Sequence, residues 1–274
     1  MHPFFETIFA LSMLAPCFVT TATASADDHY DCSDRASAIV KQAYPFARAV
    51  NGGYKVGEKT ISLPESREST AVMCRVWLSH PHLTLAAIPL MKNNDGAESD
   101  CDIELLVLDS TDLAVRGRIL LSNRASDQGA PIDIVSFDDG EYQLSADTLV
   151  FGFRVKREKN YPTASFQQEV LSLFAFANGR IKPPLDRLVT LRSSDESGSD
   201  DCTDQSTEMR AALSLTKLSH HGYRDIDLRE ANRSSRQTGT AEHCSEENAH
   251  SIKHHQLIFD GTHYAVPDAL HDGN

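Results

Sequence analysis

Apolar side chains recur with a period of two along much of this chain, and this alternation constrains the fold more than any other feature. Neighbouring side chains of an extended strand point to opposite faces of a sheet, so the pattern predicts strands with one buried face. Clear examples lie at residues 71–78, 83–91 and 103–108. We therefore expect a β-rich domain over residues 54–266.

Short turn signals separate these apolar runs. Asn178-Gly179 lies between two of them, and both residue types tolerate the positive φ of a tight hairpin. Asp109-Ser110-Thr111-Asp112 and His220-His221-Gly222 mark two further hairpins. About a dozen strands joined mainly by short turns predict a mainly β fold of antiparallel sheets, as an irregular sandwich or a small propeller-like arrangement.

One segment, 27–53, departs from this pattern. Ser33 or Asp34 is a suitable cap, and Pro45 is expected to end or kink a helix that begins there. The apolar residues recur at helical spacing, at Ala36, Ile39, Val40 and Ala43. The sequence therefore predicts one short N-terminal helix.

Residues 1–26 have the form of a secretory signal peptide. An apolar stretch over residues 8–19 leads to Ala24-Ser25-Ala26, the small-residue pattern of a cleavage site, although no Lys or Arg precedes it. The stretch is shorter than the ~20 residues of a spanning helix. We expect cleavage after Ala26, a periplasmic or secreted location, and no membrane span after cleavage.

Cysteines fit an oxidising compartment. Five remain beyond the predicted leader, and such residues usually pair, which leaves one over. The favoured pairs are Cys202–Cys244 and Cys74–Cys101, with Cys32 left over, although spacing alone leaves other connectivities open.

The charge limits the partners. The chain has 39 Asp and Glu against 26 Lys and Arg, a net charge of −13. Such a surface repels phosphate backbones and anionic headgroups, so neither nucleic acid nor a membrane surface is an expected partner. A protein partner in the cell envelope is compatible with this charge.

Two polar stretches, 193–207 and 231–254, interrupt the alternation and are predicted to be long loops that present a binding face. Residues 267–274 are predicted to be a tail. The second stretch contains His250 and His254, whose i, i+4 spacing binds one metal ion from a helix face. Ser251 stands where the zinc-protease motif has Glu, so a His-rich hydrophilic loop is the preferred interpretation.

Residues 93–102 are rich in Asn, Asp and Glu, which are oxygen ligands of the kind that Ca²⁺ prefers. They lack the regular spacing of an EF-hand loop, so a solvated acidic turn is preferred there and no cofactor is predicted.

Catalytic signatures are weak. The sequence has no Gly-x-Ser-x-Gly elbow, and Ser214-Leu215-Thr216-Lys217 lacks the companion motifs of the β-lactamase set. Asp225 and Asp227 are predicted to form the acidic outer face of a strand, and no catalytic residue is assigned.

The preferred hypothesis is a non-enzymatic exported protein that binds another macromolecule, as an inhibitor or accessory factor. The alternative is a periplasmic hydrolase with a His/Asp/Glu site assembled from several strands.

Four short blocks carry a resemblance to known proteins. Residues 74–77, 84–91 and 102–107 resemble exported proteobacterial proteins of unknown function, and residues 259–264 resemble a strand-turn-strand unit of secreted β proteins. The resemblance implies export and β structure, and it carries over no catalytic residue.

Overall fold

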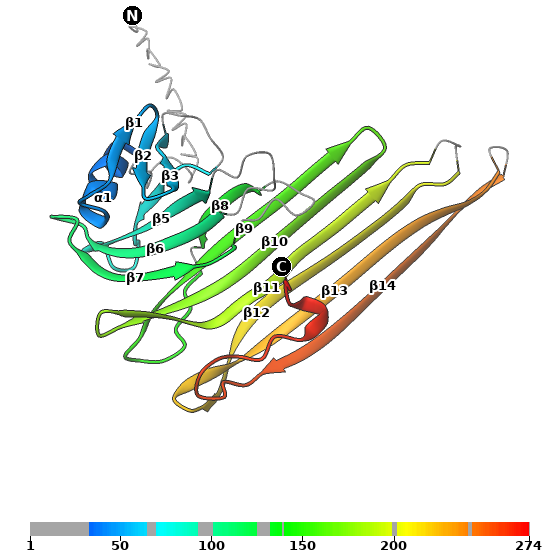
Figure 1. Ribbon diagram of the computed structural model, residues 1–274. Helices are drawn as coiled ribbons and strands as arrows, with labels where there is room; N and C mark the ends of the chain where they lie inside the picture. Colours follow the sequence, from blue (N-terminus) through cyan, green and yellow to red (C-terminus); the bar gives the residue numbers. More distant parts are fainter. Residues whose placement is uncertain are drawn as a thin grey trace, which may run out of the picture.

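The computed structural model describes residues 33–64, 70–92, 101–124, 132–138, 140–198, 202–240 and 243–273. The predicted leader, Cys32 and most of the acidic turn at 93–102 lie outside the described residues. The prediction of a mainly β fold is confirmed, because the described chain forms two antiparallel seven-stranded sheets (Figure 1).

The first sheet, sheet A, contains the first half of the chain. Its order is β1-β2-β3-β5-β6-β7, and β4 also pairs with β5. The strands are β1 (Arg48–Val50), β2 (Gly53–Val56), β3 (Lys59–Ser62), β4 (Met73–Val76), β5 (Leu83–Lys92), β6 (Cys101–Asp109) and β7 (Val115–Leu121).

The second sheet, sheet B, is a meander in which each strand pairs with its neighbour in sequence, in the order β14-β13-β12-β11-β10-β9-β8. The strands are β8 (Ile132–Asp138), β9 (Leu149–Tyr161), β10 (Ala164–Ala177), β11 (Arg180–Glu196), β12 (Gln205–His220), β13 (Tyr223–Thr240) and β14 (His243–Leu257). The predicted turn at Asn178-Gly179 joins β10 to β11, with φ of 52° and 73°.

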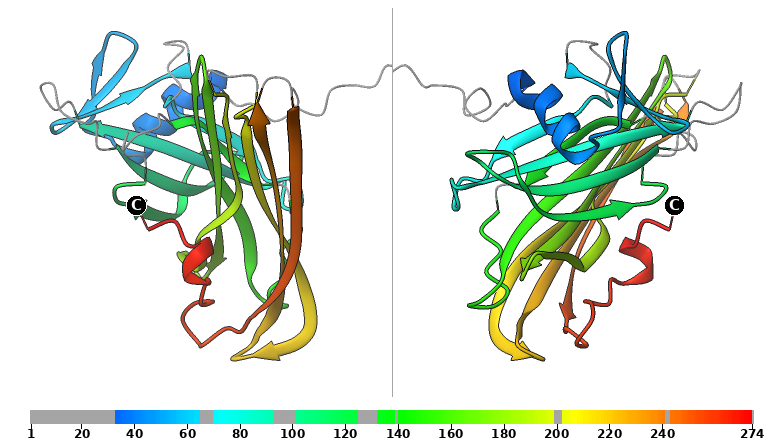
Figure 2. Two further views of the ribbon diagram at one scale, coloured as in Figure 1. Left: turned by 90° about the vertical axis from the view of Figure 1, so that its right-hand side faces the viewer. Right: turned by 60° about the vertical axis from the view of Figure 1, so that its left-hand side comes forward.

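The central strands of sheet A, β5 and β6, are buried on both faces. Helix α1 (Ala36–Ala43) packs Ile39 and Val40 against one face, where Ile88 and Leu106 belong to the same cluster. The opposite face packs on the β8–β10 side of sheet B through the list Leu85, Leu105, Val107, Phe137, Phe151, Phe153 and Phe174. Both layers are seen in Figure 2, with α1 outermost. This burial explains why β5 and β6 read as nearly continuous apolar runs.

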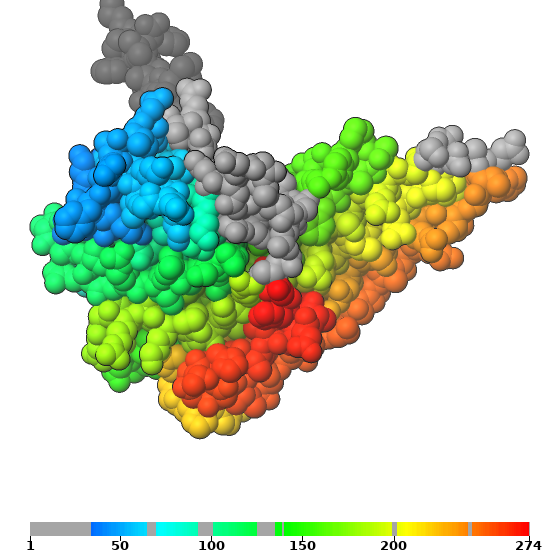
Figure 3. All heavy atoms as spheres, viewed as in Figure 1, coloured from blue at the N-terminus to red at the C-terminus, as the bar shows by residue number. Residues whose placement is uncertain are grey.

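Sheet B divides along its length. Strands β11 and β12 pair only between Leu191–Glu196 and Gln205–Arg210, and beyond that point their other halves diverge. The space is filled by a second core that includes Leu188, Leu228 and Tyr264. The C-terminal segment, drawn red in Figure 3, covers this core on one side.

The predicted loop at 231–254 is wrong, and the predicted loop at 193–207 is shorter than expected. Strand β11 continues to Glu196 and β12 begins at Gln205, while residues 231–240 lie in β13 and residues 243–254 lie in β14. Almost every residue of β14 is exposed. A strand that buries neither face has no need of apolar alternation, so the signal used to find strands is absent from it.

The predicted tail at 267–274 is also wrong. Residues Asp268–Leu270 form a 3₁₀ turn, and the Leu270 side chain is buried in the second core. Asp272 is buried as well and forms an ion pair with Arg157 at 3.1 Å. The C-terminus is therefore docked on sheet B.

The helix is shorter than the segment that predicted it. A 3₁₀ turn at Ser33–Arg35 precedes α1, whose N-cap position is Arg35 without a side-chain cap. The helix ends before Pro45, as predicted.

Of the two predicted disulfides, Cys202–Cys244 is confirmed, with a Cα–Cα distance of 5.5 Å. It links the β11–β12 connection to the start of β14. The pair Cys74–Cys101 is wrong. Cys74 faces α1 and takes part in another disulfide, whereas Cys101 points toward sheet B and retains a buried thiol that donates to Asp102 O. Two side chains on opposite faces of one sheet cannot bond.

Candidate functional site

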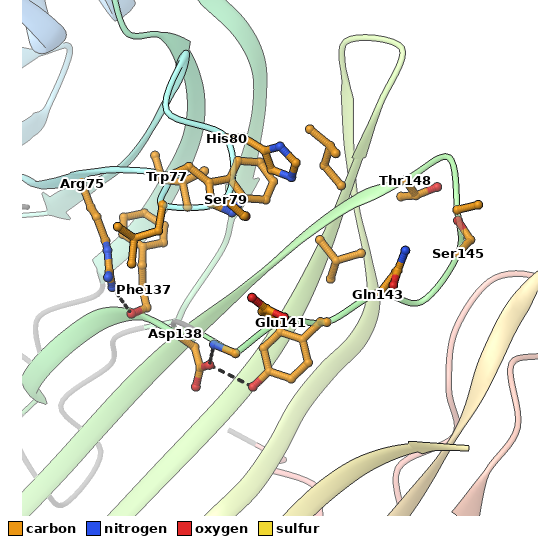
Figure 4. A pocket seen from close by; sticks show the side chains of 17 residues that line it. Arg75, Trp77, Ser79, His80, Phe137, Asp138, Glu141, Gln143, Ser145 and Thr148 are labelled. Atoms are coloured by element: carbon orange, nitrogen blue, oxygen red, sulfur yellow. Dashed lines mark hydrogen bonds between the residues drawn. The ribbon is translucent and has the colours of Figure 1, made fainter. Parts of the chain in front are cut away.

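A pocket of about 490 Å³ opens at one end of the contact between the sheets (Figure 4). The loop after β4 forms one wall and the connection from β8 to β9 forms the other. The polar and aromatic side chains that line it include Arg75, Trp77, Ser79, His80, Asp138, Glu141, Gln143, Ser145 and Thr148. These residues come from two segments about 60 positions apart in sequence, so sequence spacing gives no sign of the pocket.

The wall from sheet A is aromatic. The indole of Trp77 is largely buried and makes edge contacts with His80 at 4.9 Å and with Phe151 at 5.6 Å between ring centroids. Burial of the imidazole and the nearby His82 lower the pKa of His80 below its ordinary value. His80 is therefore held neutral near pH 7 as part of an aromatic surface.

On the opposite wall, Asp138 and Tyr142 are held by structural partners, and Glu141 also lines this wall. The carboxylate of Asp138 binds Arg154 and accepts hydrogen bonds from the Tyr142 hydroxyl at 3.0 Å and from Gly140 N at 2.6 Å. Burial, followed by the charge of Asp138, raises the pKa of Tyr142. On the other side, Arg75 donates to the carbonyl of Phe137 at 3.2 Å.

These contacts limit what the pocket can do. Nucleophilic catalysis needs a nucleophile in hydrogen-bond reach of a base, and general acid–base catalysis needs a tuned group facing the substrate. Asp138 does not face the pocket as a free carboxylate, because its contacts with Arg154, Tyr142 and Gly140 hold this wall together. The pocket has the concave form and the mixed aromatic and polar lining that are typical of small-molecule sites.

The structure separates the predicted metal ligands His250 and His254. Both lie on β14, where four residues span about 13 Å, too far for one ion. His254 contacts Asp227 at 3.3 Å instead. Within the described part of the chain, no group of three or more His, Cys, Asp or Glu side chains is placed to hold a metal ion.

Other histidines of this region also lie beside carboxylates of their own. His220 contacts Asp225 at 2.8 Å and His255 contacts Glu230 at 2.8 Å. Asp225 is fully buried and also accepts from Gln256, so its prediction as part of an acidic outer face is wrong. Asp227 is half-buried, and the i, i+2 pattern gave no sign of this difference.

Glu230 is the second buried carboxylate of this region. Its burial favours a raised pKa, but hydrogen bonds from Asn232 and His255 and the charge of Lys253 hold the pKa below its usual range. The carboxylate is therefore ionised and serves to anchor the middle of the hairpin.

An exposed surface of paired strands lies on β12, β13 and β14. The strand register places Arg229 opposite His254, Arg233 opposite His250, and Ala231 between Arg210 and Ile252. We call this surface the outer face; its members are Arg210, Arg229, Arg233, His250, Ile252 and His254. All six side chains are exposed, including Ile252 at 54%. Glu208 and Asp227 lie on the same face, beside Arg210 and His254 respectively.

No family model, no curated protein and no solved structure matches this chain. The fold defines a two-sheet antiparallel β protein in which a long hairpin extends beyond the core. In the described residues no helix has the length and apolar character to cross a membrane.

Proposed function

We propose that this chain is an exported, non-enzymatic protein that binds a protein partner in the cell envelope, as an inhibitor or accessory factor. The outer face is the proposed contact surface. The observation that carries the proposal is an exposed isoleucine surrounded by arginines and histidines on a hydrogen-bonded sheet.

The composition of the outer face supports this role. Arginine is enriched in protein interfaces, because its guanidinium combines an apolar plane with several donors. Ile252 supplies an apolar anchor at the centre, with Arg229 and Arg233 beside it. A partner that offers carboxylates around an apolar pocket would complement this arrangement.

The surface is also well ordered for binding. Strands β13 and β14 pair continuously from Ile226 and Leu257 to Thr240 and His243. The disulfide Cys202–Cys244 fixes the end of this ladder to the β11–β12 connection. A surface held by its backbone loses little conformational freedom on binding.

The hydrolase alternative receives less support. Its histidines would need to gather with carboxylates in a concave site, whereas His220, His254 and His255 each contact a different carboxylate. The pocket of Figure 4 contains none of them. Export is supported by the leader pattern and by the disulfide, which persists in oxidising compartments.

The test is capture of partners from envelope extract by the purified chain. We expect a protein retained by the natural chain to be lost when Arg229→Glu and Arg233→Glu are combined. The matched control is Arg116→Glu combined with Arg180→Glu, which makes the same charge change away from the outer face. Equal capture by both double variants would refute the outer face as the contact surface.

A further inference from the structure

Strand β14 is the edge of sheet B, and its backbone groups on one side have no strand beside them among the described residues. The strand is 15 residues long and pairs with β13 in a continuous register. It contains no proline, and positions 243–254 are all exposed. Long regular edges of this kind accept another strand readily, and proteins usually shorten, bulge or cover them.

The charges on β14 are ordered by sign. Glu246 and Glu247 lie near its beginning, and Lys253 and His254 lie near its end. Isolated charges on an edge usually prevent pairing. An acidic half followed by a basic half instead matches the same strand running in the opposite direction.

We propose that β14 pairs antiparallel with β14 of a second copy of this chain, about a two-fold axis that passes beside His250. An axis perpendicular to the sheet preserves its two faces, so each residue pairs with one of the same face. Residue 250 is the midpoint of His243–Leu257, so this register also overlaps the whole strand.

One charge pair is matched in this register. Glu247 lies opposite Lys253 of the second copy, and Glu246 lies opposite its His254, which carries a charge only when it is protonated. The two-fold axis repeats both contacts. Opposite charges directly across an antiparallel pair stabilise it, and like charges destabilise it.

Neighbouring registers lose the match. A shift of two residues in one direction places Glu246 opposite Ile252 and Glu247 opposite Ser251. A shift in the other direction places Glu246 opposite Gln256 and leaves only Glu247 opposite a histidine. The register with the greatest backbone overlap is therefore also the one with the best charge complementarity.

The dimer would form about 15 new backbone hydrogen bonds, one for each residue of the strand. It would join the two copies of sheet B into one continuous sheet, with two outer faces side by side on one surface. This inference does not depend on the proposed function, since the chain can form the dimer whether or not a partner binds the outer face.

The experiment is a charge exchange followed by sedimentation equilibrium of the full mature chain with its disulfides intact. Glu247→Lys places Lys opposite Lys, and Lys253→Glu places Glu opposite Glu. We expect the dimer dissociation constant to rise about tenfold or more for each single variant. Glu58→Lys, an exposed turn residue of sheet A, is the matched control and is expected to leave the dimer unchanged.

An equimolar mixture of the two variants is the decisive test of charge pairing across the dimer. In a heterodimer of Glu247→Lys with Lys253→Glu, every Lys again faces a Glu, so an equimolar mixture is expected to recover the association of the natural chain. Recovery also shows that both variants are folded, which matters because Lys253 lies 3.7 Å from the buried Glu230. A natural chain that sediments as a monomer at every concentration, or a mixture that stays monomeric while both variants melt like the natural chain, would overturn the proposal.

Discussion

The buried ion pair of Asp272 with Arg157 gives the sharpest test of how the C-terminus is held. The two side chains are 6% and 7% exposed, and their charged atoms are 3.1 Å apart. The Arg157 guanidinium also donates to Gln168 at 3.1 Å. Replacing the carboxylate by Asp272→Asn removes the only negative charge among these contacts and leaves a cation in a desolvated site.

Removing one partner of a buried ion pair typically costs about 3–5 kcal/mol, because the remaining charge loses both its partner and its water. For a chain of this size each kcal/mol lowers Tm by about 2–4 °C. We therefore expect Asp272→Asn to melt about 10 °C below the natural chain, as measured by circular dichroism. Neighbouring Arg187 adds to the effect, because burial and the charge of Arg124 lower its pKa and Asp272 opposes that shift.

Two further variants separate charge from packing. Asp109→Asn breaks an ion pair with Arg116, in which the Arg116 side chain is 52% exposed, and should change Tm far less. The double variant Asp272→Leu with Arg157→Met removes both charges and should recover part of the loss. If Asp272→Asn melts within about 2 °C of the natural chain, the docked C-terminus described here is refuted.

Three other outcomes follow from the structure. Replacing both Cys202 and Cys244 by Ser opens a link of sequence separation 42 and should lower the free energy of unfolding by about 3–4 kcal/mol, with faster amide exchange in β13 and β14; unchanged exchange there would contradict the bracing role. The lowered pKa of His80 means that the unfolded chain binds this proton more readily, so its contribution to stability is present above about pH 6.5 and is lost as the pH falls. His80→Gln should therefore flatten the fall in stability between pH 7 and pH 5, and an unchanged slope in urea titrations would count against a desolvated imidazole. Trp77→Ala removes the largest side chain of the pocket wall and should cost about 3–5 kcal/mol in chemical denaturation, a loss that an exposed indole would not produce.

The sequence predicted those parts of the fold that local residues determine. The turn at Asn178-Gly179 needs two residues with positive φ, and the chain supplies them next to each other. The helix before Pro45 is likewise marked by four small or apolar side chains that recur at helical spacing, and all four are buried. Such elements are determined by residues within a few positions of each other, so they can be predicted from the sequence alone.

The missed features depend on contacts between distant segments. Cys74 lies on β4 and Cys101 on β6, on either side of β5. Whether their side chains share a face depends on the β4–β5 and β5–β6 registers, which cannot be inferred from the local sequence. The pocket has the same origin, since Trp77 and Tyr142 meet only after both sheets have packed. The segment of His250 and His254 shows neither strand nor helix periodicity, so the sequence predicted a His-rich loop there, with a metal site on a helix face as the alternative.

The polar hairpin raises the question of what stabilises a strand that buries neither face. Its far end is held by cross-strand polar pairs, with Ser235 donating to Glu246 at 2.8 Å and Thr238 bonded to Ser245 at 3.2 Å. The hydrogen bond from Ser235, together with one from Asn248, lowers the pKa of Glu246, so this carboxylate stays charged on the open edge. A charged edge residue opposes pairing with an arbitrary strand, because its charge would be desolvated without compensation. Such a residue favours pairing only where a cation lies across from it, and on β14 the adjacent Glu247 meets that condition, because the reversed order of the same residues places Lys253 opposite it. The feature that concealed this hairpin from sequence analysis, its charged and polar composition on both faces, is therefore the feature that would select its partner strand.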